Sequence, residues 1–232
     1  MFKMMKLDCF GMKSFWLRIF LRALVPFAMI LLNMPLMVMP LMAFMMQDSA
    51  FYAFVAEEKG KLNHLYMTLP VNRKMIVHAR FTLIIIGLFI GIALGTALLL
   101  ASSVLLYGRT LLGLPFVYTF NPDLNTMLLI ICGSALFCAI INLPSLPLLL
   151  KLGYNKGKFI GFYLPSFGMF ALAIVTINLI SNVEAFREFT FSAIDWALSN
   201  IVGTSAIMLG TSTLLFAASY VISQRVYAKR EF

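Results

Sequence analysis

The sequence is poor in charged and reactive side chains. Of its 232 residues 12% are charged, and it contains three cysteines and two histidines. Cys9, Cys132 and Cys138 form no CxxC pair, and neither His64 nor His78 has a companion at metal-ligand spacing. The HExxH and GxSxG motifs are absent as well. This shortage argues against a metal centre, a redox dithiol or a hydrolase, so we expect no cofactor and no catalytic residue in the chain.

Long apolar runs take the place of charged segments. Hydrophobic residues make up 62% of the chain, and the mean hydropathy is +0.95, whereas soluble domains average about 45–50% apolar residues. A water-soluble fold of this size could not bury so much apolar surface. A β-barrel would need short alternating segments, but the runs here are unbroken. We therefore expect an all-α polytopic membrane protein.

The basic residues set the orientation of the chain in the membrane. The formal net charge of +9 could suggest nucleic-acid binding. However, all Lys and Arg except Arg109 and Arg187 fall in four short segments at the ends of the apolar runs. This distribution follows the positive-inside rule and argues against a nucleic-acid partner. It predicts a multi-pass protein of the plasma membrane with both termini in the cytoplasm.

Between these basic segments we expect six spans in a single transmembrane domain, residues 1–232. The first two are inferred from sidedness: residues 23–56 carry one charge, and the segments on both sides are basic, so the chain must cross and return. A basic amphipathic elbow helix is expected before them at residues 1–14. The predicted spans are residues 15–33, 35–56, 81–107, 127–150, 159–183 and 196–224.

Two features inside the spans, a glycine pattern and one charged residue, indicate specific roles. Gly87, Gly91 and Gly95 form two overlapping GxxxG motifs, which predict close packing against a second helix that the pattern does not identify. Asp48 is the one charge well inside an apolar run. It is either a functional intramembrane carboxylate or one capped by Ser or Thr hydroxyls near the inner end of a helix; both readings stay open.

The fourth span should end in a kink and a basic turn. Asn142, Pro144 and Pro147 predict a kink at its inner end. A short basic inner loop, residues 151–158, follows. Its sequence resembles a P-loop only faintly, because one spacer residue is missing and Phe159 replaces the Ser or Thr. We expect a glycine-rich turn without a nucleotide site.

A charged island at residues 57–80 interrupts the apolar sequence. Gly60 should end any helix continuing from the second span. The segment that follows can form a short helix with Leu65, Tyr66 and Leu69 on one face, and Pro70 would end that helix. The alternative is a merely solvated loop, but the apolar stripe favours an exposed helical surface that docks with another protein.

The residues of this island carry a family resemblance. Glu57-Glu58-Lys59, followed by Leu69-Pro70-Val71-x-Arg73-Lys74-x-Ile76-Val77, resembles the inner loop "DEK … LPVSRKxIV" of type-2 ABC transporter permeases. A second match runs from Leu146-Pro147 through Lys151-Leu152-Gly153-Tyr154 to Lys156. The number of spans and the basic elbow agree, so the resemblance covers essentially the whole chain. The very short first hairpin and Gly157, where the family more often has Ala, depart from the pattern.

The resemblance implies a permease that pairs with a second permease, identical or homologous, and with two separate ATPase subunits that bind the ATP. The compact six-span subgroup includes phenol-soluble modulin exporter permeases, which implies a bacterial exporter of an amphipathic or hydrophobic peptide or drug. The implied ATPase-coupling residues are Glu57, Glu58, Lys59, Leu65, Tyr66, Leu69, Pro70, Arg73 and Lys74. The implied second inner loop contributes Lys151, Gly153, Lys156 and Lys158.

Two other functions are compatible with the sequence. A non-transporting membrane scaffold or immunity protein could use the 57–80 loop to recruit a soluble partner. A secondary carrier is the less favoured reading, since no inverted repeat is evident and Asp48 stands alone.

Overall fold

The computed structural model describes residues 16–31, 37–59, 73–111 and 123–229, and the secondary structure in these ranges is entirely helical. Five of the described segments are long and apolar enough to cross a membrane. They are Val38–Val55, Lys74–Ala101, Leu124–Tyr154, Lys156–Asn182 and Ile201–Ala228. The predicted fold class, an all-α polytopic membrane protein, is confirmed.

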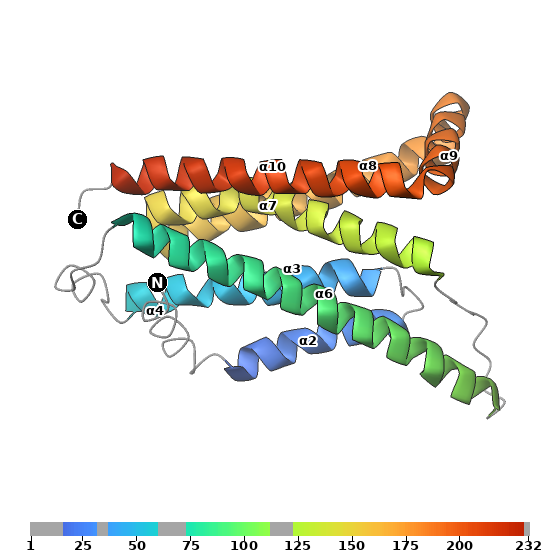
Figure 1. Cartoon of the computed structure of the whole chain (residues 1–232), viewed down its shortest axis with the longest axis horizontal. Helices are drawn as coiled ribbons and strands as arrows, with labels where there is room; N and C mark the ends of the chain where they lie inside the picture. The colour runs from blue at the N-terminus through green and yellow to red at the C-terminus, as the bar shows by residue number, and fades with distance from the viewer. Residues whose placement is uncertain (1–15, 32–36, 60–72, 112–122, 230–232) are drawn as a thin grey trace.

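The helices run alternately back and forth along one bundle axis (Figure 1). In chain order the elements are α2 (Trp16–Leu31), α3 (Val38–Ala50), α4 (Tyr52–Lys59), α6 (Arg73–Leu111), α7 (Leu124–Lys158), the π-helix η3 (Phe159–Tyr163), α8 (Leu164–Asn182), α9 (Glu184–Ser199) and α10 (Ile201–Ala228). α2 begins and α10 ends at the same end of the bundle (Figure 1). The predicted first span corresponds to α2, which has 16 residues and contains Pro26. The predicted elbow, residues 1–14, lies outside the described residues.

The glycine stripe of α6 packs directly on the backbone of α3. A Cβ atom on Gly91 would lie 2.6 Å from Ala43 Cα, one on Gly87 would lie 3.0 Å from the Met46 carbonyl oxygen, and one on Gly95 would lie 2.9 Å from Met39 Cα. Only residues without a side chain allow two helices to approach so closely. The helix that packs on these glycines is therefore α3, in antiparallel register.

The turn at the end of the fourth span is made by Gly153. α7 remains helical through Pro144 and Pro147, and its non-helical residue is Gly153, at φ 78° and ψ 178°. Only glycine adopts such angles readily. After this turn the chain folds back, so that a Cβ on Gly157 would lie 2.8 Å from Leu149 Cα. The reversal therefore lies six residues after Pro147, inside the glycine-rich turn predicted at residues 151–158, whereas the helix continues through the prolines at which a kink was predicted.

A π-helical turn follows, at the start of the next span. Pro165 has no N–H, so it cannot donate to the carbonyl of Gly161 one turn earlier. That carbonyl lies 2.6 Å from the Ser145 hydroxyl of α7, which also lies 2.5 Å from the Ile141 carbonyl. π-turns occur where the regular hydrogen-bond ladder is interrupted in this way. The hydroxyl therefore joins the two arms of the hairpin at Gly153.

α7 also packs along α10, through small polar side chains. Ser205, Ser212 and Ser219 recur at seven-residue spacing on α10 and are all buried. The Ser219 hydroxyl donates to the Asn142 carbonyl at 3.0 Å, and the Asn142 amide donates to the Cys138 carbonyl at 2.7 Å. Small residues allow close approach of membrane helices, and hydroxyls that bond across the contact add to it.

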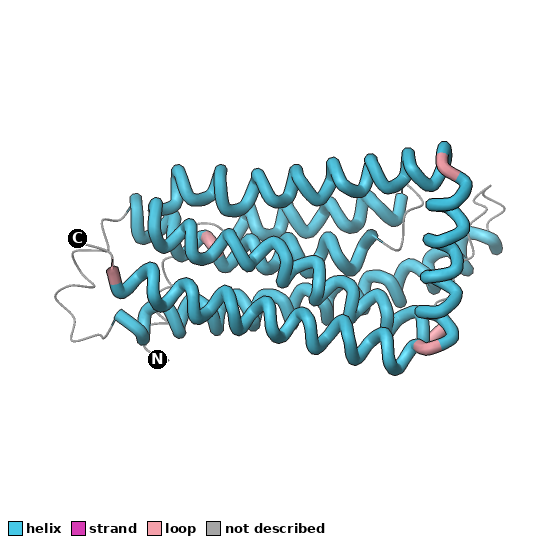
Figure 2. The backbone as a smooth tube through the Cα atoms, turned by 90° about the horizontal axis from the view of Figure 1, so that it is seen from above, coloured by secondary structure: helices cyan, strands magenta, loops and turns pink. Residues whose placement is uncertain are grey.

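The segment between the last two spans is a helix, α9, which lies across the end of the bundle (Figures 1 and 2). No helix was predicted between the fifth and sixth spans, and the sixth span was predicted to begin at Trp196. The structure instead ends α9 at Ser199 and starts α10 at Ile201, because Asn200 adopts the non-helical angles φ −115° and ψ 50°.

The α3–α6 contact can be tested by adding a side chain to it. We expect Gly91→Leu to lower the melting temperature in detergent markedly, because overpacking against a backbone costs about 1–3 kcal/mol or more. Gly168→Leu is the matched control, since Gly168 is also helical but has no heavy atom within 4 Å of an added Cβ. Equal melting temperatures for the two variants would contradict this packing.

Candidate functional site

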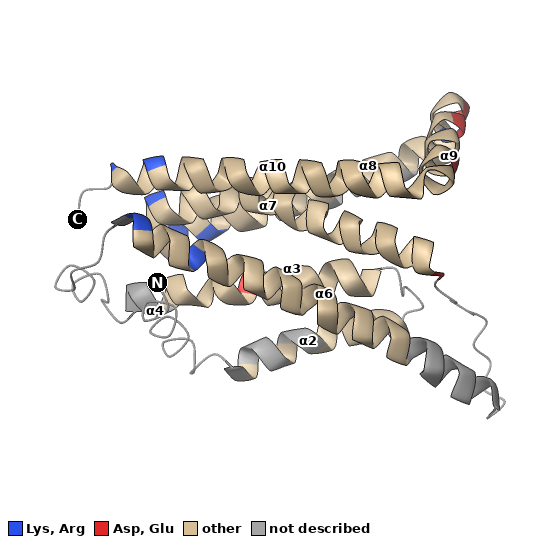
Figure 3. Cartoon of the chain, in the orientation of Figure 1, with Lys and Arg blue, Asp and Glu red and all other residues tan. Residues whose placement is uncertain are grey.

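Basic side chains gather at one end of the bundle (Figure 3). This end, called here the basic end, is where α6 starts, where α7 turns back at Gly153 and where α10 finishes (Figure 1). The described basic residues of these segments are Lys74, Arg80, Lys151, Lys156, Lys158, Arg225 and Lys229. The positive-inside rule predicts that this end faces the cytoplasm.

The opposite end carries acidic side chains (Figure 3). Asp123 caps the first turn of α7, and its carboxylate accepts a hydrogen bond from the Thr126 backbone N–H at 2.7 Å. Hydrogen bonds from the side chain and backbone of Thr126 hold the pKa of Asp123 below its usual value. On α9, Glu184 forms an exposed ion pair with Arg187 at 3.2 Å. The same rule predicts that this acidic end is the outer one.

Both ends of the 57–80 segment lie at the basic end. Residues 57–59, which include Glu57, Glu58 and Lys59, form the last turn of α4, while Arg73 and Lys74 begin α6. Lys74 is exposed. The predicted docking residues Leu65, Tyr66, Leu69 and Pro70 lie outside the described residues.

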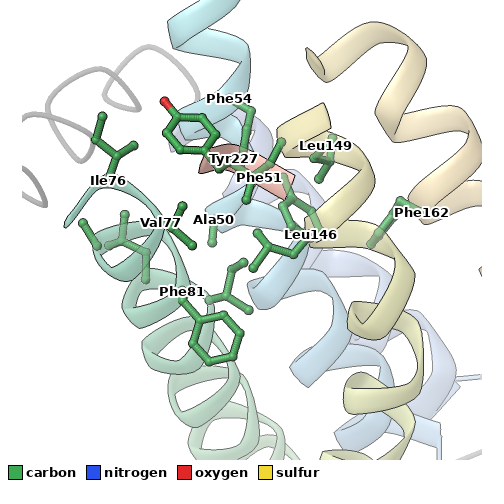
Figure 4. Close-up of a cluster of buried hydrophobic side chains, with 14 of the residues drawn as sticks. Ala50, Phe51, Phe54, Ile76, Val77, Phe81, Leu146, Leu149, Phe162 and Tyr227 are labelled. Carbon is green, nitrogen blue, oxygen red and sulfur yellow. The ribbon is translucent and has the colours of Figure 1, made fainter. Parts of the chain in front are cut away.

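The flanks of this segment enter one buried cluster, shown in Figure 4. This anchor cluster joins α3, α4, α6, α7, η3 and α10 through fully or nearly fully buried side chains. They include Ala50, Phe51, Phe54, Ile76, Val77, Phe81, Leu146, Leu149, Phe162 and Tyr227. Phe162 stacks edge-on against Phe51 with ring centroids 5.5 Å apart. Both flanks of the 57–80 segment therefore pack into one cluster with α7, η3 and α10.

Arg80 is the charged member of this region. It is 1% exposed, and its guanidinium carbon lies 4.2 Å from the centroid of the Phe54 ring. A guanidinium over an aromatic face is attracted by the ring quadrupole, most strongly where water is excluded. The pair connects α4, the helix that leads into residues 57–80, with α6, the helix in which that segment ends.

The second predicted inner loop, residues 151–158, also lies at the basic end and contacts α4. Tyr154, the residue after the turn glycine, packs against Tyr52 and Val55 of α4. Lys158 donates to the Tyr154 hydroxyl at 2.9 Å, and its ammonium lies 5.0 Å from the Tyr163 ring centroid. Lys151 and Lys156 are exposed. The structure therefore brings the turn at Gly153 against the helix that leads into residues 57–80.

A polar link connects α6 with α10 beside the anchor cluster. The Nδ1 atom of His78 and the Tyr220 hydroxyl lie 3.2 Å apart, and the Gln224 amide donates to the same hydroxyl at 2.6 Å. Tyr220 also packs on Phe81, with ring centroids 5.1 Å apart. The start of α6 is thus held on both sides, by α4 and by α10.

Asp48 lies deeper in the bundle, on α3. It is 7% exposed and sits between the buried residues Gln47 and Ser49. The Ser49 hydroxyl donates to the Met45 carbonyl at 2.9 Å. Gly87, Gly91 and Gly95 face the same helix, as described above. Among the described residues no three His, Cys, Asp or Glu side chains gather into a group that could hold a metal ion.

Sequence reasoning missed three residues of this site: Arg80, Tyr154 and Tyr220. It counted Arg80 only as a marker of the inner side. A signal was present, because Arg80 lies two turns inside the helix that starts at Arg73, which places its charge within the bundle. The partners of Tyr154 and Tyr220 are far away in sequence, so no local pattern identifies them.

The geometry can be compared with known proteins. The family described as ABC-2 family transporter protein matches residues 3–228, which is nearly the whole chain. Neither a curated protein nor a solved structure matches the chain. The family consists of membrane components of ABC transporters, which accords with the helical spans and with inner segments held together at one end. The chain belongs to the ABC-2 family of transporter proteins.

Proposed function

We propose that this permease belongs to an exporter whose separate ATPase subunits seat on residues 57–80 and bind the ATP. One observation carries the proposal: both flanks of that segment enter the anchor cluster, which α4, α6, α7 and α10 share. A partner that pushes on the segment therefore acts on four helices at once.

The route of such a push follows the packing. α6 runs without interruption for 39 residues from Arg73 to Leu111, so a tilt at its start is carried toward the outer end of the bundle. The Arg80–Phe54 pair couples that tilt to α4, and the contact between Tyr154 and Val55 couples it to the turn at Gly153. These contacts are the physical basis for ATPase-driven rocking of the bundle.

A second permease, identical or homologous, completes the transporter in this proposal. α8 packs mainly on its chain neighbours η3 and α9, and its large apolar side chains, such as Phe167 and Leu172, are exposed. A span with so little lateral support within its own chain has surface available for another permease. The path for the substrate would lie between the two copies.

The proposed cargo is amphipathic or apolar, such as a peptide or drug. Away from the ends of the spans, the described charged side chains are Asp48 and Arg80, and both are buried. Between the ends of the spans, the exposed side chains of α6, α8 and α10 are mostly apolar. A polar sugar would find few hydrogen-bond partners on such surfaces, whereas an amphipathic helix would bury its apolar face there.

Reconstitution tests this function against the scaffold alternative. In proteoliposomes, we expect the chain alone to hydrolyse no ATP, and the complex with its partner ABC ATPase to hydrolyse ATP and move a labelled amphipathic helical peptide. A complex that hydrolyses ATP but moves neither peptide nor apolar dye would favour a non-transporting scaffold. ATP hydrolysis by the chain alone would contradict the proposal that separate subunits carry the ATPase site.

Docking on residues 57–80 predicts a charge effect confined to that segment. Reversing Arg73 and Lys74 to Glu, or Pro70→Gly, should lower transport at least several-fold while expression and melting temperature change little. The matched control reverses Arg225 and Lys229, which are exposed at the same end but belong to α10. Equal losses in both double variants would indicate a general effect of inner charge and would remove the docking assignment.

The contact between the two inner loops should affect coupling specifically. Tyr154→Ala removes the packing on Tyr52 and Val55, so we expect less transport per ATP hydrolysed rather than a loss of ATPase activity. Leu152→Ala is the control, because Leu152 flanks the same turn and is exposed. The ratio of peptide moved to phosphate released is the measurement. An unchanged ratio for Tyr154→Ala would show that this contact does not help to couple ATP hydrolysis to transport.

A further inference from the structure

Lys158 lies at the edge of the membrane rather than at the tip of the hairpin that turns at Gly153. The two arms of this hairpin pack closely, since a Cβ on Gly157 would lie 2.8 Å from Leu149 Cα. Lys158 is five residues beyond the turn, which corresponds to about 7 Å along a helix. It falls within the candidate span Lys156–Asn182. Its positive charge therefore lies where the hydrocarbon meets the lipid headgroups at the basic end.

Two tyrosines hold the ammonium of Lys158 at this depth. It donates to the Tyr154 hydroxyl at 2.9 Å, and it lies 5.0 Å from the centroid of the Tyr163 ring. Lysine side chains at the ends of spans commonly extend toward water, whereas this one is half-buried and reaches a ring five residues deeper in the span. The bond to Tyr154 uses one of the three N–H groups of the ammonium, so Lys158 can also donate to an anion beside the helix.

An exposed aromatic row begins next to this charge. Phe159, Tyr163 and Phe167 follow one another at four-residue intervals and are 64%, 39% and 68% exposed. Successive residues of a helix are about 100° apart, so Lys156 and Lys158 stand on either side of Phe159. Lys156 is exposed. Two ammonium groups therefore flank the inner end of an aromatic row that continues into the membrane.

The charges of this hairpin are all positive. From Leu124 to Asn182, through α7, η3 and α8, the charged residues are Lys151, Lys156 and Lys158. Neither arm of the hairpin therefore supplies a carboxylate that could balance them. A partner that binds Lys156 and Lys158 and also covers the aromatic row must combine a negative charge with a long apolar part.

We propose that this junction binds an anionic phospholipid, with its phosphate between Lys156 and Lys158 and an acyl chain along Phe159, Tyr163 and Phe167. Phosphate oxygens accept charge-assisted hydrogen bonds from ammonium groups, and basic sites at the cytoplasmic ends of spans bind anionic headgroups. A zwitterionic lipid carries its own cation beside the phosphate, so it gains less from the two lysines. A headgroup with a net negative charge, such as that of phosphatidylglycerol, fits the site.

The depth of the site selects lipid over a protein partner. An ATPase that docks from the cytoplasm reaches the tip of the hairpin but not the aromatic row along the span. An acidic protein segment would have to bring a carboxylate to the membrane edge, which is costly, whereas a phospholipid already carries its phosphate there. A second permease keeps a separate surface of α8, because the exposed Leu172 lies about 140° around the helix from Phe167.

Tryptophan quenching by brominated lipid tests this site. Trp16→Phe and Trp196→Phe remove both tryptophans of the chain, and Phe167→Trp then places a single reporter on the aromatic row. The full chain is incorporated into phosphatidylcholine nanodiscs that contain a small fraction of lipid brominated on the middle acyl carbons. This lipid has either a phosphatidylglycerol or a phosphatidylcholine headgroup. Because the bromine depth is the same, the ratio of the first quenching constant to the second measures the headgroup preference beside the reporter.

Phe89→Trp in the same background is the control reporter. Phe89 is 67% exposed on α6, and Phe167 is 68% exposed. Phe89 lies sixteen residues from the start of α6 at Arg73, and Phe167 lies fourteen residues from the turn at Gly153, so their depths are similar. We expect a ratio of about two or more at Phe167→Trp and about one at Phe89→Trp, because the two lysines attract the anionic headgroup to the aromatic row.

Substitution of the lysines localises the phosphate. The double variant Lys156→Gln, Lys158→Gln should lower the ratio at Phe167→Trp to about one, whereas Lys158→Arg keeps the charge and should retain it. Lys151→Gln is the matched control, because Lys151 is exposed on the other arm of the hairpin, and it should leave the ratio unchanged. Glycerol phosphate in solution should not lower the ratio, since it lacks the acyl chains.

The result does not depend on transport, because ATP and cargo are absent, and monodisperse elution with unchanged helical circular dichroism establishes that a variant is folded. A ratio of about one at Phe167→Trp would overturn the proposal. So would an equally raised ratio at Phe89→Trp, which would indicate general attraction by the net charge of +9, or an equal loss in Lys151→Gln. A loss on adding glycerol phosphate would indicate a site for soluble phosphate instead, and a reporter that neither lipid quenches would indicate a face covered by protein.

Discussion

The fold depends on one close contact, in which the glycine face of α6 lies on the backbone of α3. In a membrane, lipid tails are as apolar as leucine, so helices associate through van der Waals packing rather than by hiding from water. Such packing is strongest where backbones touch, and Gly91 brings α6 onto Ala43 without an intervening side chain. Every added methylene there would separate the helices. The three glycines thus fix both the distance and the register of the pair.

That register decides what meets at the basic end. Each step along α6 is matched by an equal step back along α3. Gly95 lies opposite Met39, Gly91 opposite Ala43, and Gly87 opposite Met46 and Gln47. Continued to the basic end, the same register places Arg80 beside Phe54, as the 4.2 Å contact shows. A slip of one turn would separate the pair and leave the arginine charge without its aromatic neighbour. The helix contact in the apolar layer therefore positions the two flanks of residues 57–80.

The sequence predicted the features that depend on local composition. Runs of apolar residues defined the spans, and the clustering of Lys and Arg assigned their ends, because lipid and the positive-inside rule act on short segments. The turn at residues 151–158 was predicted as well, and Gly153 makes it. The prediction that differs is the kink at Pro144 and Pro147, because α7 stays helical there while it packs along α10 through the Ser219–Asn142 contact. α9 was missed because residues 184–195 combine three carboxylates with short apolar runs, a composition that an irregular loop between two spans has as well.

The packing divides the described chain into a bundle and an arm. α3, α4, α6, α7 and α10 share the anchor cluster, the glycine contact and the serine contact of α7 with α10. α8 takes part in none of these three contacts. It is connected to the bundle through η3 at the basic end and through α9 at the acidic end. Because α9 has 16 residues, it spans about 24 Å, far more than the 8–10 Å between the axes of packed helices. The outer end of α8 is therefore held away from α10, and α8 packs mainly on its chain neighbours η3 and α9. The packed part of the described chain thus extends past Gly153 through η3, whose Phe162 belongs to the anchor cluster, and it ends where α8 begins.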